Sequence, residues 1–156
     1  DLSQLLGEQD EQWDYAKNVR WRLSGVKAKH GVHAHQLADY LGLTGDAVDN
    51  IPGVPGIGPK TAATLLSHFG SLDEMLDKLD EIPYLRLRSA AQHSQKLREH
   101  RDMALLSRKL ATIRCDIPLP DEQVLGARAP SDQNALTALI EQLRFGPLTR
   151  RRLISL

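Results

Sequence analysis

The segment GDAVDNIPGVPGIGPKTAATLL, residues 45–66, decides how the chain folds, because it joins a proline- and glycine-rich turn to an apolar helix. Prolines end a helix that precedes them, and glycines allow positive φ angles and a close approach of neighbouring backbone. Pro59 suits the first position of a helix, where its missing N–H needs no partner. Residues 36–43 carry apolar side chains at helical spacing, so the sequence predicts two helices joined by a hairpin. The glycines of this hairpin are Gly53, Gly56 and Gly58.

The hairpin nearly matches the nucleotide-binding loop G-x-x-x-x-G-K-[ST], but Pro59 separates Gly58 from Lys60 and spoils the spacing. That loop also follows a β-strand, whereas residues 36–43 read as a helix, so a phosphate-loop NTPase is disfavoured. Two alternatives remain. The N–H groups of Lys60 and Thr61, with the lysine charge and the threonine hydroxyl, would bind one phosphate of a polymer backbone without regard to base sequence. Otherwise the turn is a tight helical corner that binds nothing.

Two carboxylates, Asp46 and Asp49, precede the turn at a spacing of three, followed by Asn50. Near the end of a helix they can face one cation, and hard ions such as Mg²⁺ or Mn²⁺ prefer such oxygens. Helix capping and Asx turns are the alternative use of the same side chains. A metal beside a phosphate-binding hairpin would suit two-metal phosphodiester hydrolysis, in which carboxylates hold ions about 3.5–4 Å apart.

The remaining sequence predicts a mainly α protein with little strand after residue 23, and residues 116–130 read as a proline-rich connector. Before the hairpin we expect a helical turn at 1–6, a strand pair within 13–23, a short helix at 25–30 capped by Ser24 and ended by Gly31, and a helix at 33–43. After it we expect a helix at 61–69 ended by Gly70, a helix at 71–79 begun by Ser71, and one broken or two consecutive helices over 85–113. The last expected helix, at 131–145, is capped by Ser131 and stopped at Gly146 and Pro147.

Composition favours a soluble globular protein. The 156 residues suffice for one domain, 41% of them are hydrophobic and 26% are charged, and no apolar run approaches the ~20 residues that span a bilayer. Cys115 is the single cysteine, so an internal disulfide is excluded and a reducing cytosol is expected. The chain begins at Asp1 rather than at methionine, which we interpret as the start of a fragment of a longer protein.

A net charge of zero hides a basic stripe between residues 84 and 114. Solvated helix faces are one interpretation of this stripe. Beside a phosphate-binding hairpin, contact with DNA phosphates is favoured, and Arg86 and Arg88 are the better candidates. The basic residues of the stripe are Arg86, Arg88, Lys96, Arg98, Arg101, Arg108, Lys109 and Arg114.

Residues 45–62 closely resemble the helix–three-turn–helix region of bacterial 5′-nucleases, the family of the 5′→3′ exonuclease domain of DNA polymerase I, stand-alone and phage 5′-exonucleases, and flap endonucleases. The family pattern G-D-x-x-D-N-I-P-G-V-x-G-I-G-x-K-T-A is matched throughout. DLSQL at residues 1–5 is similar to the tail of the family's D-K-D-x-x-Q-L motif, and residues 97–119 resemble its R-x-x-A-x-L-S-x-x-L-A-x-I-x-x-D segment. The resemblance covers most of residues 1–120, whereas residues 121–156 match only loosely.

The resemblance implies roles for individual residues. Asp46 and Asp49 match carboxylates that help to hold a second divalent ion, Mg²⁺ or Mn²⁺, and Asp1 matches a further metal-site aspartate. The family also binds K⁺ through hairpin carbonyls, and a carbonyl set around tight glycine turns suits a monovalent cation that bridges to phosphate. The K⁺ carbonyls implied here are those of Leu43, Thr44, Val54 and Ile57. The implied DNA-contacting residues of the hairpin are Asn50, Gly53, Gly56, Gly58, Lys60 and Thr61.

By this resemblance the chain is expected to be the C-terminal, DNA-binding part of a metal-dependent 5′→3′ exonuclease or flap endonuclease, inactive alone. Residues 1–23 would be a remnant of the nuclease α/β domain, residues 24–120 the helical domain, and residues 121–156 a helical tail. The expected partner is duplex DNA with 5′ ends or flaps. The protein is expected to be a cytoplasmic, nucleoid-associated monomer that does not bind a membrane. The loosely matching tail favours a stand-alone parent protein over one fused to a polymerase. The alternative is a helix-hairpin-helix module that binds duplex DNA without nuclease activity, which would have no need of the aspartate pair.

Overall fold

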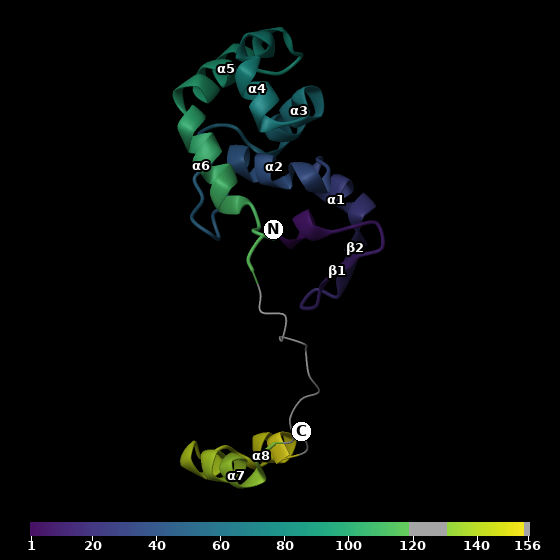
Figure 1. Ribbon diagram of the computed structural model, residues 1–156, viewed down its shortest axis with the longest axis vertical. Coiled ribbons are helices and arrows are strands. Elements are labelled where there is room, and N and C mark those ends of the chain that lie inside the picture. The colour runs from purple at the N-terminus through teal and green to yellow at the C-terminus, as the bar shows by residue number, and fades with distance from the viewer. Residues whose placement is uncertain (119–130, 155–156) are drawn as a thin grey trace. The chain divides into compact units, whose positions relative to one another are not determined.

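The computed structural model describes residues 1–118 and 131–154. The chain divides into two units, Asp1–Cys115 and Asp116–Leu156 (Figure 1). The first unit is mainly α, as predicted, with a two-stranded sheet near its N-terminus. The elements, with η marking 3₁₀ helices, are η1 (Leu2–Leu5), β1 (Glu11–Asp14), β2 (Val19–Arg22), α1 (Leu23–His30), η2 (Ala34–Gln36), α2 (Leu37–Thr44), α3 (Pro59–Phe69), α4 (Leu72–Asp77), η3 (Leu79–Tyr84), α5 (Ala90–Glu99), α6 (Arg101–Ala111), α7 (Gln133–Gln142) and α8 (Pro147–Ile154).

The N-terminal segment forms the predicted helical turn and an antiparallel strand pair that aligns Glu11 with Arg22. The expected cap of α1 was wrong. β2 runs directly into the helix, so the extended Arg22 precedes α1 and Ser24 lies inside it. Gly31 ends α1 with a φ of 75°, as predicted. Residues 1–23 pack within the same compact unit as the helices; their assignment to another domain of a longer protein stays a prediction.

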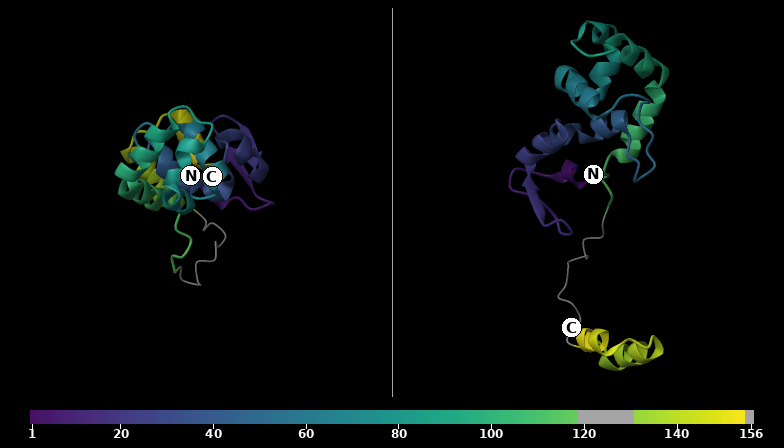
Figure 2. Two further views of the ribbon diagram at one scale, coloured as in Figure 1. Left: turned by 90° about the horizontal axis from the view of Figure 1, so that it is seen from above. Right: turned by 180° about the vertical axis from the view of Figure 1, so that it is seen from behind.

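Helices α2 and α6 pack against each other, with α6 along one edge of the first unit (Figure 1, Figure 2). Their close approach depends on Gly42 of α2, because a Cβ placed there would lie 2.9 Å from the Cβ of Arg108 and 3.1 Å from the carbonyl oxygen of Ala104. A methyl group at that position would force the two helices apart. α6 therefore lies directly against the helix that leads into the aspartate pair and the hairpin.

Helix α3 begins at Pro59 and is followed by Gly70 with a φ of 86°, as predicted. Its buried residues recur at helical spacing and form one face of the helix. This face packs into one hydrophobic core with residues of α1, α2, α4, α5 and α6. The buried side chains of α3 are Ala62, Leu65, Leu66 and Phe69. The buried Gln36 provides hydrogen bonds to carbonyl groups at the C-terminal end of α3. Its side-chain amide nitrogen donates to the carbonyls of Leu66 at 3.1 Å and Gly70 at 2.7 Å.

Two of the later predictions concern helix boundaries, and both are confirmed. Ser71 caps α4 by accepting a hydrogen bond from the Glu74 N–H at 3.2 Å. The region 85–113 contains two consecutive helices, α5 and α6, separated at His100. The Ser71 cap follows from a local preference that is visible in the sequence, whereas α4 ends earlier than predicted, at Asp77, and α5 begins later than predicted, at Ala90.

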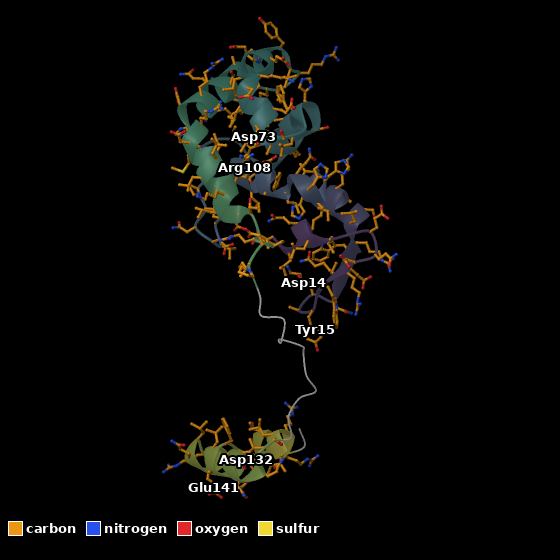
Figure 3. The ribbon with its side chains drawn as sticks, in the orientation of Figure 1. Asp14, Tyr15, Asp73, Arg108, Asp132 and Glu141 are labelled. Carbon is orange, nitrogen blue, oxygen red and sulfur yellow. The ribbon has the colours of Figure 1, made fainter. Side chains whose placement is uncertain are left out.

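Arg108 of α6 joins α2 and α4 through two carboxylates. Its guanidinium donates to Asp73 at 2.7 and 3.0 Å and to Asp39 at 3.2 Å, while the other Asp39 oxygen accepts from the Leu72 N–H at 3.0 Å. Figure 3 shows Arg108 and Asp73 side by side. The hydrogen bond from Arg108 lowers the pKa of Asp73, and the same pairing raises the pKa of Arg108.

We expect this ion pair to stabilise the fold less in acid. Because the pKa of Asp73 is lowered by folding, its stabilisation is complete above the unfolded-state pKa of about 3.9 and is lost as the pH falls through the lowered folded-state pKa. Asp73→Asn should flatten the pH dependence of the unfolding free energy below about pH 4. The effect should stay under about 1 kcal/mol because the Asp73 side chain is 66% exposed. Urea titrations of both proteins across this range measure it, and an equal flattening by Asp10→Asn would contradict the assignment.

The second unit consists of α7 and α8, joined by an ion pair between Arg150 and Glu141 at 3.6 Å. Asp132 caps α7, not Ser131 as predicted, because its carboxylate accepts from the N–H groups of Asn134 at 2.9 Å and Ala135 at 3.0 Å. Figure 3 labels Asp132 and Glu141 on this helix.

The boundaries of the second unit also differ in part from the prediction. Helix α7 ends earlier than expected, at Gln142, and α8 begins at Pro147. Most of the predicted connector, residues 119–130, lies outside the described residues. Within the described part of the chain, no helix combines the length and apolar character needed to cross a membrane.

Candidate metal centre and nucleic-acid interface

The two predicted metal aspartates lie in a closed loop that follows α2. Gly45, at a φ of 72°, ends the helix and donates from its N–H to the Leu41 carbonyl at 2.8 Å. Asp46 and Ile51 then exchange two backbone hydrogen bonds of 2.8 Å each, which close the loop between them. Asp49 therefore lies on a short turn whose ends are fixed.

The side chain of Asp46 has a structural use as well. One of its oxygens accepts from the Val48 N–H at 2.9 Å, so the Asx-turn interpretation is confirmed for this residue. No hydrogen bond from a described residue reaches the other Asp46 oxygen. Asn50 is exposed and adopts a φ of 56°, which turns the chain back toward Ile51. The Asx turn thus orients the carboxylate without using both of its oxygens.

Asp1 is held near this loop by Gln4, which the metal-ligand pattern of the sequence does not include. The Gln4 side chain donates to the Ala111 carbonyl at 2.9 Å and accepts from the Ile113 N–H at 3.4 Å, which ties η1 to the end of α6. The Gln4 N–H also donates to the Asp1 carbonyl at 2.9 Å. The glutamine of the DLSQL motif was the available signal for this positioning role.

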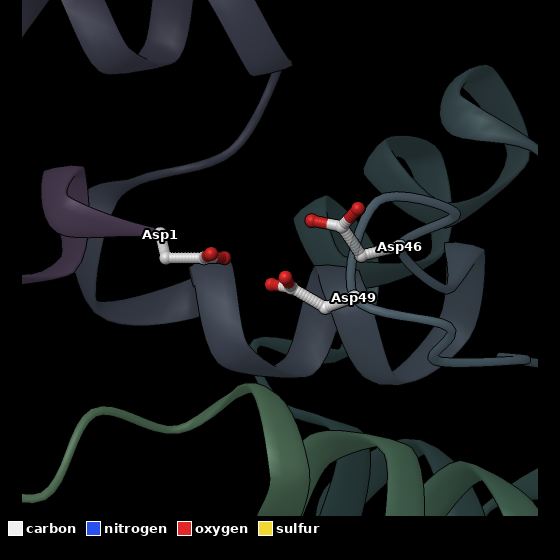
Figure 4. A group of neighbouring side chains, drawn as sticks. All are labelled: Asp1, Asp46 and Asp49. Carbon is white, nitrogen blue, oxygen red and sulfur yellow. The ribbon is translucent and has the colours of Figure 1, made fainter.

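Asp1, Asp46 and Asp49 converge, with one carboxylate oxygen from each lying within 4.8 Å of the others (Figure 4). Asp46 is half-buried and the other two are exposed. None of the three forms an ion pair with a described residue. A set of convergent carboxylate oxygens is the donor chemistry that Mg²⁺ and Mn²⁺ prefer, so these residues fit a hard divalent cation. Among the described residues, this is the one group of at least three acidic, histidine or cysteine side chains whose potential ligand atoms lie this close together.

The hairpin lies against α6 through Gly53, which is buried and donates from its N–H to the Ser107 hydroxyl at 3.1 Å. Gly53 has a φ of 64°, and a Cβ placed there would lie 2.2 Å from the Gly45 nitrogen. The glycine is explained by this backbone contact with Gly45. In contrast, Gly56 is exposed at a φ of 80°, and Gly58 is half-buried with open space beside it.

The start of α3 is open to an approaching ligand. Gly58 is the residue before the helix, and no atom lies within 4 Å of a Cβ placed there. Lys60 is exposed, Thr61 is half-buried, and no described carboxylate pairs with Lys60. The N–H groups at the start of a helix and the lysine charge both favour an anion.

Two of the four carbonyls predicted to bind K⁺ accept backbone hydrogen bonds within the hairpin. The Leu43 carbonyl accepts from the Val54 N–H at 2.8 Å, and the Val54 carbonyl accepts from the Ile57 N–H at 3.1 Å. A carbonyl oxygen has a second lone pair, so these bonds do not exclude a cation. Thr44 follows Leu43 and uses its hydroxyl to donate to the Tyr40 carbonyl at 3.0 Å. The K⁺ site stays a prediction.

The basic stripe does not act as one surface, because several of its members form ion pairs. Arg98 pairs with Asp80, and Arg101 pairs with Asp77 at 3.5 Å. Arg86 and Arg88 lie between η3 and α5 and are exposed, and they alternate with half-buried leucines, so both point outward. Their contact with DNA stays a prediction.

Comparison with known proteins identifies the fold. The family described as 5′-3′ exonuclease, C-terminal SAM fold, matches residues 32–133, which include α2, the aspartate loop, the hairpin and α3. The chain belongs to this exonuclease family. The match confirms the resemblance inferred from residues 45–62 and the predicted mainly α fold with its helix–hairpin–helix.

Relatives of this exonuclease-family chain include longer proteins. The chain is 44% identical over 120 residues to DNA polymerase I of Bacillus caldotenax, which is 77% of this chain and 13% of that relative. It is 36% identical over 151 residues to DNA polymerase I of Rhizobium leguminosarum, 97% of this chain and 14% of the relative. It is 40% identical over 118 residues to the flap endonuclease Xni of Shewanella amazonensis, 76% of this chain and 44% of the relative. The chain thus spans less than half the length of each relative.

Two solved structures of phage T5 enzymes share the fold. The T5 5′-exonuclease with divalent metal ions (zinc) bound superposes with a TM-score of 0.59 at 23% identity, over 71% of this chain and 40% of that one. A complex of the T5 flap endonuclease with DNA and metal ions gives a TM-score of 0.59 at 23% identity, over 70% of this chain and 38% of that one. At this level of identity the likeness shows the fold.

Proposed function

We propose that the chain is the part of a divalent-metal-dependent 5′→3′ exonuclease or flap endonuclease that binds duplex DNA and completes the metal site. The observation that carries the proposal is the convergence of Asp1 with Asp46 and Asp49, with carboxylate oxygens within 4.8 Å of one another. A module that only binds DNA has no need of this convergence. Membership of the exonuclease family supports the same assignment.

The three aspartates would hold Mg²⁺ or Mn²⁺ as the site's ion. Bound there, a divalent ion supplies an activated water and stabilises the leaving oxygen of the phosphodiester. Three carboxylates within 4.8 Å of one another suit a single ion, whereas two-metal hydrolysis needs ions about 3.5–4 Å apart with more ligands. We therefore propose that the carboxylates of this chain act together with others in the parent, and that the chain alone does not cleave.

The hairpin would bind the backbone of duplex DNA that carries 5′ ends or flaps. The first turn of α3 presents Lys60, Thr61 and the accessible backbone of Gly58 to one phosphate, and Gly56 and Asn50 lie on the exposed turns nearby. A K⁺ held by the predicted carbonyls of the hairpin would add a positive charge at the same surface. Contacts of this kind position a duplex without reading its sequence. A monomer suffices for them.

Lys60→Ala tests the proposed grip directly. The loss of one phosphate contact should weaken binding of every duplex alike, by about eightfold at roughly 0.1 M salt, and reduce the slope of log K against log salt by about 1. Fluorescence anisotropy with duplexes of unrelated sequence measures both quantities. Lys78→Ala is the matched control, because Lys78 directly follows α4 and pairs with Glu74 at 3.0 Å. A loss that depends on base sequence would contradict a backbone grip.

A further inference from the structure

A second lysine reaches the hairpin from another helix. Lys96 belongs to α5, and its ammonium lies against Gly56: a Cβ placed on that glycine would be 2.1 Å from the lysine Nζ, 3.4 Å from Cε and 3.6 Å from Cδ. The aliphatic stem of the lysine therefore runs along the backbone of the turn, and the charge ends at the turn itself. In the sequence, Lys96 is one of the eight basic residues of the stripe.

Lys96 differs from its basic neighbours in having no counter-charge. It is half-buried, and no hydrogen bond or ion pair joins its side chain to another described residue, whereas its backbone carbonyl accepts from the His100 N–H at 2.9 Å. Arg98, two positions further along α5, pairs with Asp80, and Arg101 of α6 donates to the Leu76 carbonyl at 2.9 Å. A partly desolvated ammonium is disfavoured unless an anion compensates it, and here its donors are directed at the exposed turn.

Gly56 provides the space for this charge. Its φ of 80° favours glycine, and a Cβ there would displace the lysine ammonium, which is the far end of a flexible side chain. Gly56 is exposed and lies two residues before Gly58, the residue that precedes α3 and has open space beside it. The glycines of the hairpin thus place the Lys96 charge beside the same backbone turn that leads into Lys60.

We propose that Lys96 is a second phosphate-binding residue of the hairpin, so that the duplex backbone is held by cations from two helices, Lys60 of α3 and Lys96 of α5. The proposal rests on the proposed function and adds a binding residue to it. A phosphodiester is the ligand that fits, because it supplies a permanent negative charge at a turn that the described carboxylates do not neutralise. Lys96 lies outside the aspartate cluster, so it contributes to binding and not to metal coordination.

The test measures duplex binding by the full 156-residue chain for the wild type, Lys96→Gln, Lys60→Ala, the double variant and Lys78→Gln. Lys78→Gln removes the same charge from a lysine that pairs with Glu74. Each measurement is made at a temperature where circular dichroism shows the variant to be folded. Lys96→Gln should weaken binding about eightfold at roughly 0.1 M salt and lower the salt slope by about 1, and the double variant should lower the slope by about 2. Lys96→Arg should recover the slope.

The outcomes separate the two proposals. If Lys60→Ala weakens binding and Lys96→Gln does not, Lys96 is no phosphate ligand and the proposed function stands. If neither variant weakens binding, the backbone grip itself is wrong. If Lys96→Gln lowers the melting temperature but leaves the salt slope of the folded protein unchanged, the lysine only supports the turn, and the inference is overturned. An equal slope change for Lys78→Gln would also overturn it.

Discussion

In the full-length parent protein, Asp46→Asn is expected to lower the rate of flap or 5′-end cleavage by about a thousandfold. The change removes a metal-binding charge but keeps an oxygen that can accept from the Val48 N–H, so the Asx turn is preserved. A catalytic divalent ion supplies several kcal/mol of transition-state stabilisation, and about 4 kcal/mol corresponds to three orders of magnitude in rate. Single-turnover cleavage in the presence of Mg²⁺ or Mn²⁺ measures the loss.

Duplex affinity of the Asp46→Asn protein should change by less than about twofold, because the phosphate contacts lie on the hairpin and on the start of α3. Asp10→Asn is the matched control. Its carboxylate also accepts a local backbone bond, from the Gly7 N–H at 2.9 Å, but lies outside the aspartate cluster. Unchanged cleavage by Asp46→Asn would favour the alternative, a module that binds duplex DNA without hydrolysing it.

Gly53→Ala is expected to produce the largest loss of stability, about 3–4 kcal/mol. The new Cβ would meet three backbone atoms, the Gly45 nitrogen at 2.2 Å, the Thr44 carbonyl carbon at 2.6 Å and the Gly45 Cα at 2.8 Å. None of these is the end of a flexible side chain, so the loop or α2 must move, at a cost of about 1–3 kcal/mol. The positive φ adds about 1–2 kcal/mol. The melting temperature should fall by more than about 10 °C, as measured by circular dichroism.

Two other glycines separate the causes of this loss. Gly70 has a φ of 86° and no atom within 4 Å of an added Cβ, so Gly70→Ala should cost the conformational strain alone. Gly58 has open space and a φ of −94°, so Gly58→Ala should leave stability within about 0.5 kcal/mol while it hinders the approach of the DNA backbone. If Gly53→Ala is no more destabilising than Gly70→Ala, the contact between Gly53 and Gly45 does not hold the hairpin.

The helix ends that the sequence predicts correctly rest on interactions within a few residues. Pro59 begins α3, Gly31 and Gly70 follow helices with positive φ angles, and the Ser71 hydroxyl caps α4. The Ser24 cap was wrong because β2 runs directly into α1, and the Ser131 cap was wrong because of competition between adjacent residues. Asp132 takes the capping position from Ser131 because its carboxylate accepts two N–H groups, a choice that local propensity leaves open.

The candidate site divides in the same way. The aspartate spacing and the hairpin glycines of residues 45–62 indicated a metal and a phosphate-binding turn, and their resemblance to a family implied a role for Asp1. Neither pattern identified Gln4 or Lys96, since each acts through a partner far along the chain, Gln4 at the end of α6 and Lys96 at Gly56. A contact between distant segments leaves no periodic trace in one sequence.

The sequence by itself determined the mainly α fold, the hairpin between two helices and the residue types suited to a divalent ion, because backbone preferences and side-chain chemistry are properties of short segments. Only the tertiary structure decided which of these residues meet. It brought Asp1 to the aspartate pair through the hydrogen bonds of Gln4 and laid the Lys96 ammonium against Gly56. The packing of α2 and α5 with α6 sets those distances, and packing depends on the whole core at once.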